Sequence, residues 1–138
     1  MRPILLFLLV LLAATSLGFI PDVPEWGNTE QFDDEEAMSI AIRFQQSWNQ
    51  LVQGRSRIGL YHLLAENFYY EDCKSRKIGW VKYVDMAFQI NTPGVVTEAR
   101  ADKNFVIYKV QYGRQMQEIM LKKYYDHYRM ERAQGVIC

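Results

Sequence analysis

The sequence contains few of the residues that build metal sites and redox centres. Its 138 residues include two cysteines and two histidines, and no Cys-x-x-Cys or His-Glu-x-x-His spacing occurs. It also lacks a glycine-rich phosphate loop and a nucleophile-elbow serine, which excludes the commonest motifs for nucleotide binding and acyl transfer. We therefore predict no metal and no cofactor, and we expect structural roles for His62 and His127.

Long apolar runs are also missing, except at the start of the chain. Residues 4–14 form an unbroken apolar run after Arg2, and the small residues Ser16 and Gly18 follow it. The run is shorter than the ~20 apolar residues of a membrane span, and the whole pattern is typical of a secretory signal peptide. We predict a signal peptide at residues 1–18 and a secreted, extracellular protein with no membrane association after cleavage. The alternative is an uncleaved signal anchor.

The charges are unevenly distributed, although the formal net charge is zero. Residues 19–42 carry seven acidic and no basic side chains, whereas residues 43–138 carry 15 basic and nine acidic ones. The basic residues are scattered along the second segment and do not cluster. This pattern does not indicate a nucleic-acid surface, so we expect no nucleic-acid partner.

The cysteines Cys73 and Cys138 remain after export. In an oxidising compartment two such residues tend to form a disulfide. We predict an internal bridge that ties the last residue to the middle of the chain. Two unpaired thiols, or pairing between two chains, are the alternatives.

The chain after the signal peptide divides into an acidic extended arm and one folded domain. Pro21, Pro24 and Gly27 predict the arm at residues 19–32, and the domain is expected at residues 33–138. Within the domain, apolar spacings of three and four predict a long helix that Asp33 caps and Gly54 ends. Shorter helices are predicted at 56–64 and 80–89, and strands at 68–73, 95–101, 105–112, 115–125 and 127–133.

The two shorter helices are each expected to bury one apolar side. The predicted buried residues are Ile58, Leu60, Tyr61, Leu63 and Leu64 in the first helix, and Trp80, Val81, Val84 and Phe88 in the second. Because helices come early in the chain and strands come late, the sequence predicts an α+β fold.

This order of elements resembles the nuclear-transport-factor-two-like superfamily over about residues 33–133. The stretch from Leu64 to Asp72 is similar to that superfamily's passage from second helix to first strand. The Cys73-Lys74 junction and the terminal Cys138 are also similar to small, uncharacterised secreted members found in nematodes. The resemblance implies that three helices pack in the concave face of a curved mixed or antiparallel sheet. Such a cystatin-like cone contains an apolar pocket.

Members of that superfamily use the pocket differently, so fold alone does not determine function. Our first hypothesis is a secreted, non-catalytic domain that binds a small apolar molecule in the cone or an extracellular protein through its sheet. Aromatic side chains that face the helices would line the pocket, with an apolar ring and a polar handle. The candidate pocket residues are Trp48, Tyr69, Tyr108 and Tyr124.

An isomerase or dehydratase is the second hypothesis. Ketosteroid isomerases of the same superfamily use an Asp at the matching place of the first strand to move protons, and Asp72 matches it here. Those enzymes also use a Tyr of the first helix as a donor, whereas the matching region here, Ser47-Trp48, contains no Tyr. Asp72 is therefore either the general base or a polar residue at the end of a strand.

An assembly role is the third hypothesis. The predicted strand at residues 105–112 is apolar on both faces, with Phe105 and Ile107 on one face and Val106 and Tyr108 on the other. Because only one face can cover the helices, the other is a candidate interface for a homodimer.

Overall fold

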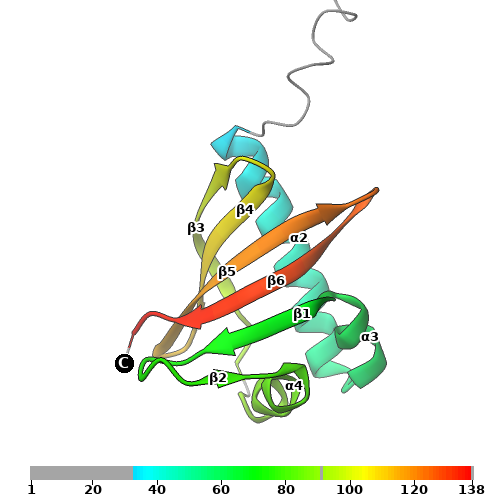
Figure 1. The fold of residues 1–138 in the computed structure, drawn as a ribbon, viewed down its shortest axis with the longest axis vertical. Coiled ribbons are helices and arrows are strands. Elements are labelled where there is room, and N and C mark those ends of the chain that lie inside the picture. The colour runs from blue at the N-terminus through cyan, green and yellow to red at the C-terminus, as the bar shows by residue number, and fades with distance from the viewer. Residues whose placement is uncertain (1–32, 91, 138) are drawn as a thin grey trace, which may run out of the picture. The chain divides into compact units, whose positions relative to one another are not determined.

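The structure, a computed structural model, describes residues 33–90 and 92–137. They form three helices and one six-stranded sheet: α2 (Asp34–Gln53), α3 (Arg57–His62) and α4 (Trp80–Gln89) with β1 (Leu64–Glu71), β2 (Lys77–Ile78), β3 (Val95–Asp102), β4 (Phe105–Tyr112), β5 (Gln115–Tyr124) and β6 (His127–Gly135) (Figure 1). The expected signal peptide, the acidic arm and Cys138 lie outside the described residues. None of the helices in the described part is long and apolar enough to span a membrane.

The sheet is mixed, with the strand order β2-β1-β6-β5-β4-β3. Only the β1–β6 pair is parallel, and the other neighbours are antiparallel. Two-residue turns connect β3, β4, β5 and β6, and each begins with a residue at positive φ: Lys103 at 56°, Gly113 at 61° and Tyr125 at 57°. Turns with positive φ match the right-handed twist of a hairpin, so the last four strands form a twisted meander.

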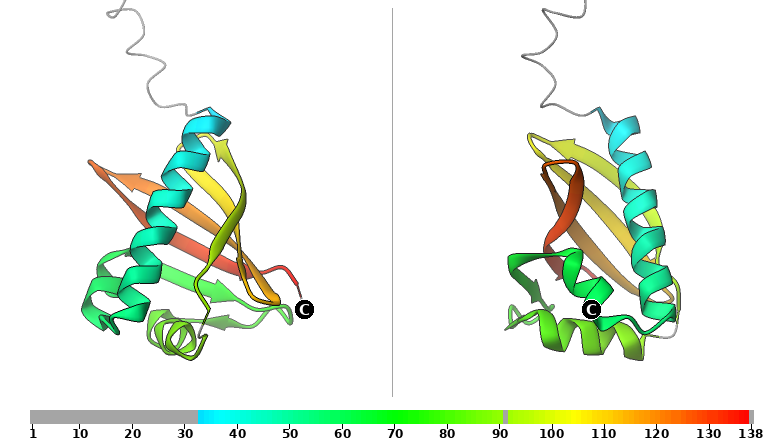
Figure 2. Two further views of the ribbon diagram at one scale, coloured as in Figure 1. Left: turned by 180° about the vertical axis from the view of Figure 1, so that it is seen from behind. Right: turned by 90° about the vertical axis from the view of Figure 1, so that its right-hand side faces the viewer.

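The sheet is curved, and α2 crosses its concave face (Figure 2). The pairing register shifts between Leu64 and Tyr69 in β1, between Val96 and Glu98 in β3, and between Met120 and Leu121 in β5. Such bulges bend the strand that carries them and increase its twist. The helix and the concave face bury a common core that includes Phe44, Trp48, Val106, Tyr108 and Ile119. The predicted α+β class and the curved mixed sheet are confirmed.

The long helix forms where the sequence predicts it. Asp33 caps its start, since the carboxylate accepts a hydrogen bond of 2.7 Å from the backbone N–H of Glu36. The carboxylate of Asp34 accepts another, of 3.1 Å, from the N–H of Ala101 at the end of β3. Gly54 follows the last turn, and its N–H donates to the carbonyl of Gln50. These contacts fix both ends of α2 and attach its first turn to the sheet.

The helix predicted at residues 56–64 is shorter in the structure. It ends at His62, and β1 already begins at Leu64, four residues before the predicted strand. The cause is a long-range contact, because the carbonyl of Leu63 accepts a 2.7 Å hydrogen bond from the N–H of Met130 in β6. The predicted burial of Ile58 and Tyr61 is also wrong, since these side chains are 74% and 48% exposed.

The buried side of α4 agrees with the prediction for Val84, and Trp80 and Phe88 pack partly buried against the core, but the prediction for Val81 is wrong. The helix buries Tyr83, Val84 and Ala87, whereas Val81 is exposed. The buried residues follow Trp80 at intervals of three, four and seven, which is the spacing of one helix face. Because this face of α4 is the buried one, Tyr83 points toward the sheet. The short strand β2, which the sequence analysis did not predict, leads into α4.

Candidate functional site

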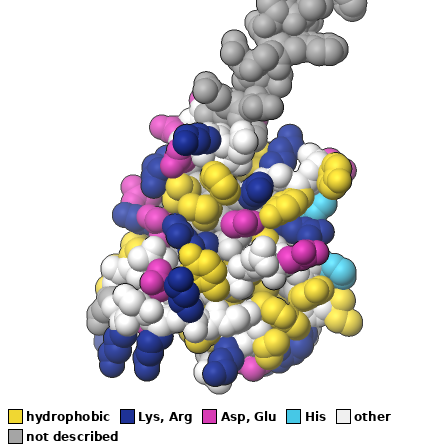
Figure 3. Space-filling view, in the orientation of Figure 1, with side chains coloured by type: hydrophobic (Ala, Val, Ile, Leu, Met, Phe, Trp, Pro, Cys, Tyr) yellow, Lys and Arg dark blue, Asp and Glu magenta, His cyan; other side chains and the backbone are white. Residues whose placement is uncertain are grey.

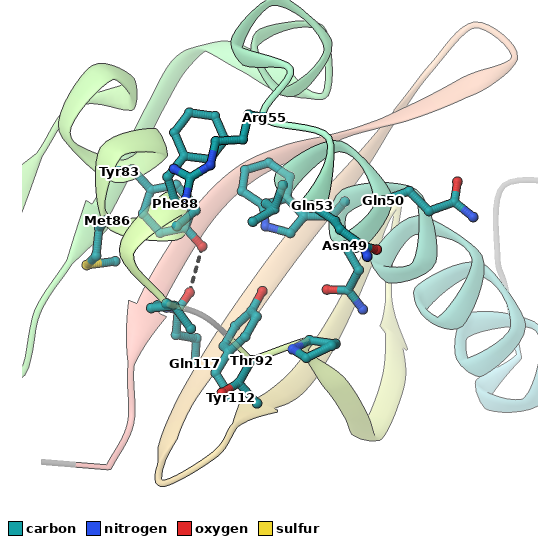
Figure 4. A pocket seen from close by; sticks show the side chains of 15 residues that line it. Asn49, Gln50, Gln53, Arg55, Tyr83, Met86, Phe88, Thr92, Tyr112 and Gln117 are labelled. Atoms are coloured by element: carbon teal, nitrogen blue, oxygen red, sulfur yellow. Dashed lines mark hydrogen bonds between the residues drawn. The ribbon is translucent and has the colours of Figure 1, made fainter.

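A cavity of about 380 Å³ lies between α2, α4 and the concave face of the sheet (Figure 4). Pockets for small ligands have volumes of about 300–1,000 Å³, so the cavity is large enough for a small organic molecule. Much of its wall is apolar. The apolar part of the wall includes Trp48, Val52, Met86, Ala87, Phe88, Ile90 and Pro93.

An aromatic cluster around Tyr83 forms one side of the cavity. The Tyr83 ring lies 4.9 Å from the ring of Phe68, 5.3 Å from Tyr70 and 5.8 Å from Trp48, measured between centroids. Its hydroxyl donates a 2.6 Å hydrogen bond to the side-chain oxygen of Gln117 in β5 (Figure 4). Burial, together with neighbouring tyrosines, raises the pKa of Tyr83 well above its ordinary value. The hydroxyl is therefore protonated at neutral pH.

A buried polar network lies behind the opposite wall, centred on Gln45 of α2. The Gln45 amide nitrogen donates to the Asn49 side-chain oxygen at 3.0 Å and to the Tyr112 hydroxyl oxygen at 2.9 Å. The Gln45 oxygen accepts a 2.8 Å hydrogen bond from the hydroxyl of Tyr108. Asn49 in turn makes two hydrogen bonds with the backbone of Gly94. The network joins α2, β4 and the segment before β3, and it brings Tyr112 to the cavity wall.

The rim of the cavity is cationic. Arg55 lines it, and the guanidinium carbons of Arg55 and Arg57 lie 5.6 and 5.5 Å from the centroid of the Phe88 ring. Arg57 also pairs with Asp85 of α4. Among the described lining residues, Arg55 is the only one that carries a charge at neutral pH.

Of the four predicted pocket residues, one lines the cavity. Trp48 is part of the wall. Tyr108 lies in the core on the far side of Gln45. Tyr69 and Tyr124 lie on the outer face of the sheet, where Lys77 covers the Tyr69 ring and the Tyr124 hydroxyl donates to Glu131 at 2.8 Å.

Several polar lining residues are absent from the predicted pocket, and Tyr83, Tyr112 and Gln117 are the buried ones among them. Tyr112 continues the inward alternation of Val106, Tyr108 and Val110, so the alternation of β4 could have identified it. Gln117 occupies an inward position of β5 but is polar, and the hydrophobic pattern therefore gave no signal for it.

Asp72 lies outside the cavity, in the turn between β1 and β2. One carboxylate oxygen accepts from the backbone N–H groups of Lys74 and Arg76 at 2.9 and 2.8 Å, and the other accepts from the Arg76 guanidinium at 2.8 Å. The Arg76 N–H, with these further donors, holds the pKa of Asp72 below its usual value. This arrangement fits a residue that shapes a turn and does not support a general base.

The outer face of the sheet mixes charged and apolar side chains (Figure 3). Across five strands, the pairing places Tyr69, Arg132, Met120, Ile107 and Arg100 in one row. Ile107 is buried despite its outward position. The next row contains the Glu98–Lys109 ion pair, at 2.9 Å. The homodimer stays a prediction, and the apolar face on which it was based is interrupted by charges.

The disulfide also stays a prediction, because Cys138 lies outside the described residues. The described part of the chain supports it in one respect. A Cβ atom placed on Gly135 would lie 3.5 Å from the sulfur of Cys73, so β6 ends beside this cysteine. Gly135 is three positions before Cys138 in the sequence.

Comparisons with known proteins identify the fold. No protein-family model and no curated protein matches the sequence. An NTF-2 like protein of unknown function from Silicibacter pomeroyi matches 75% of this chain and 98% of its own, with 5% identity and a TM-score of 0.59. An NTF2-like protein from Cytophaga hutchinsonii matches 73% and 98%, with 8% identity and a TM-score of 0.57.

A third match, a SnoaL-like protein of unknown function from Burkholderia thailandensis, covers 72% of this chain and 95% of its own, with 11% identity and a TM-score of 0.53. The chain has the nuclear-transport-factor-two-like fold. The resemblance found in the sequence is thus confirmed at the level of the fold. At identities this low the NTF2-like fold does not define a function, which has to be argued from the cavity.

Proposed function

We propose that this NTF2-like domain binds a small apolar molecule in the cavity between α2, α4 and the sheet, without catalysing a reaction. The observation that carries the proposal is the composition of the wall. It combines apolar side chains with a few fixed polar groups, as ligand pockets do. Among the described lining residues there is no carboxylate and no histidine, which are the usual general bases and acids.

The two hydroxyls of the wall are unsuited to moving protons near neutral pH. Burial raises the pKa of Tyr112 to about 12 and that of Tyr83 well above its ordinary value. Both groups therefore stay protonated and act as fixed polar contacts. We further propose that the protein acts after export from the cell, where the pairing of Cys73 with Cys138 would fix the end of the chain.

Binding of the neutral fluorescent probe N-phenyl-1-naphthylamine tests the proposed function. We expect saturable fluorescence enhancement with one site per chain. Ala87→Leu adds bulk to a buried wall position. We expect it to lower the affinity for the probe by about tenfold, because the larger side chain fills part of the space that the ligand would occupy. Circular dichroism checks that the variant is folded.

The matched control is Ile58→Ser, which removes a large aliphatic side chain that is 74% exposed and lies outside the cavity. It should leave the affinity for the probe unchanged. A signal that Ile58→Ser removes and that a folded Ala87→Leu retains would place the probe on the surface and contradict the proposal.

A further inference from the structure

The backbone of Gly94 fixes the direction of the hydrogen bonds beside the cavity. Its N–H can only donate, and it does so to the Asn49 side-chain oxygen at 3.0 Å. Its carbonyl can only accept, and it does so from the Asn49 side-chain nitrogen at 2.9 Å. The amide of Asn49 therefore has one orientation, with its oxygen and nitrogen determined by the main chain.

The orientation of Asn49 determines that of Gln45. Because the Asn49 oxygen is an acceptor, the group of Gln45 that lies 3.0 Å away must be its NH₂. The second hydrogen of this NH₂ points to the Tyr112 oxygen at 2.9 Å. The Gln45 oxygen is then free to accept from Tyr108, as observed at 2.8 Å.

Tyr112 stands at the end of this chain and accepts a hydrogen bond from Gln45. Its own proton has no acceptor among the described residues, although the side chain is buried and lines the cavity. Figure 4 shows its hydroxyl directed into the space between α4 and α2. Tyr112 therefore offers a hydrogen-bond donor to whatever occupies the cavity.

Trp48 and Gln117 offer two more donors. They are 1% and 2% exposed, and both line the cavity. The Trp48 indole N–H and the Gln117 side-chain nitrogen have no acceptor in the described part of the chain, since Tyr83 bonds only the Gln117 oxygen. Every fully enclosed side-chain nitrogen or oxygen of the described residues has a partner, so these two groups are not fully enclosed, and both residues line the cavity. Unpaired buried donors are costly, and an acceptor in the cavity would satisfy them.

The acceptor has to be neutral. Trp48, Tyr112 and Gln117 are uncharged donors, and burying an anion without a cation is strongly unfavourable. The charged lining residue, Arg55, is exposed at the rim with its guanidinium over Phe88. A carboxylate at the depth of Tyr112 would therefore lack a counter-charge.

We propose that the cavity selects apolar molecules that carry a neutral acceptor oxygen, such as the carbonyl of a ketone, aldehyde or ester. The proposal rests on the proposed function, since it specifies the ligand of the same cavity. The carbonyl accepts from Tyr112, with Trp48 and Gln117 as further donors, and the hydrocarbon part contacts the wall of Val52, Met86 and Phe88.

Two ligands of similar shape test the proposal by displacement of N-phenyl-1-naphthylamine. They are 2-acetylnaphthalene, which has a carbonyl, and 2-ethylnaphthalene, which has none. We expect Tyr112→Phe to lower the affinity for 2-acetylnaphthalene by about tenfold. The affinity for 2-ethylnaphthalene should change by less than about twofold. The anion 2-naphthoate should bind to the wild-type protein at least about tenfold more weakly than the ketone.

Tyr108→Phe is the matched control. It removes a hydroxyl from the same network, on the side of Gln45 away from the cavity. We expect it to leave both affinities unchanged, because Gly94 and Asn49 still orient Gln45. Two results would overturn the proposal and leave the proposed function intact. One is an equal loss of affinity for the ketone in Tyr112→Phe and Tyr108→Phe, and the other is an equal loss of affinity for both ligands in Tyr112→Phe.

Failure of both ligands to displace the probe from the wild-type protein would instead contradict the proposed function, and this proposal with it. If Tyr112→Phe does not fold, the infrared carbonyl band of 2-acetylnaphthalene bound to the wild-type protein replaces the variant. Hydrogen-bond donation should shift the band to lower frequency than in hexane. An unshifted band would overturn the proposal.

Discussion

Replacement of Gln45 by methionine is expected to lower the free energy of unfolding by about 3 kcal/mol. The side chain is 2% exposed and makes three hydrogen bonds, to Asn49, Tyr108 and Tyr112. Methionine has a similar length but cannot replace the amide, so the Tyr108 hydroxyl is left buried without an acceptor. An unsatisfied buried group costs about 1–3 kcal/mol, and the remaining lost bonds add to this.

Urea unfolding of the wild type and of Gln45→Met measures the effect. Gln46→Met is the control, because Gln46 is the next residue of α2 and is exposed. Its free energy of unfolding should stay within about 0.5 kcal/mol of the wild type. A Gln45→Met variant as stable as the control would show that the network contributes nothing to the fold, and the orientation of Tyr112 would lose its basis.

Alkaline pH is expected to destabilise the domain steeply. Burial raises the pKa values of Tyr83 and Tyr108 well above the ordinary value of 10.0 and that of Tyr112 to about 12. The unfolded chain therefore loses these protons first as the pH rises. The three tyrosines contribute their full stability below about pH 10 and lose it as the pH rises toward the folded pKa, which for Tyr112 means between about 10 and 12.

Each such tyrosine lowers the free energy of unfolding by at most about 1.4 kcal/mol per pH unit in this window, which gives at most about 4 kcal/mol per pH unit for all three. Unfolding free energies at pH 10 and pH 11 measure the slope. Tyr108→Phe should make the slope shallower, since one titrating group is removed. A slope that the substitution leaves unchanged would contradict the protonated state assigned to the buried hydroxyls.

The sequence was sufficient for the parts of the fold that local patterns define. Asp33 and Gly54 marked the ends of α2, and the turns at Lys103, Gly113 and Asp126 separated the last four strands. The start of β1 could not be found in this way. It depends on the pairing of Leu63 with Met130, which are far apart in the chain.

The cavity was partly predictable from the sequence, because the alternation of side chains along a strand assigns each tyrosine to one face of the sheet. Phe68 is buried, so its neighbour Tyr69 had to lie on the outer face. Counting from Trp80 along one face of α4 would have identified Tyr83. The donor character of Tyr112 could not be foreseen, because it follows from the backbone of Gly94, which is remote from Tyr112 in the sequence and adjacent to the network in the fold.

Native mass spectrometry of the protein secreted by eukaryotic cells tests the central claim most directly. We expect an added mass of roughly a few hundred daltons that leaves on denaturation and is absent in a folded Ala87→Leu variant. The denatured wild-type chain should begin after residue 18 and weigh two hydrogens less than the reduced chain, if Cys73 pairs with Cys138. Retention of the same added mass by Ala87→Leu, or a bare chain that also fails to bind N-phenyl-1-naphthylamine, would contradict a ligand in this cavity.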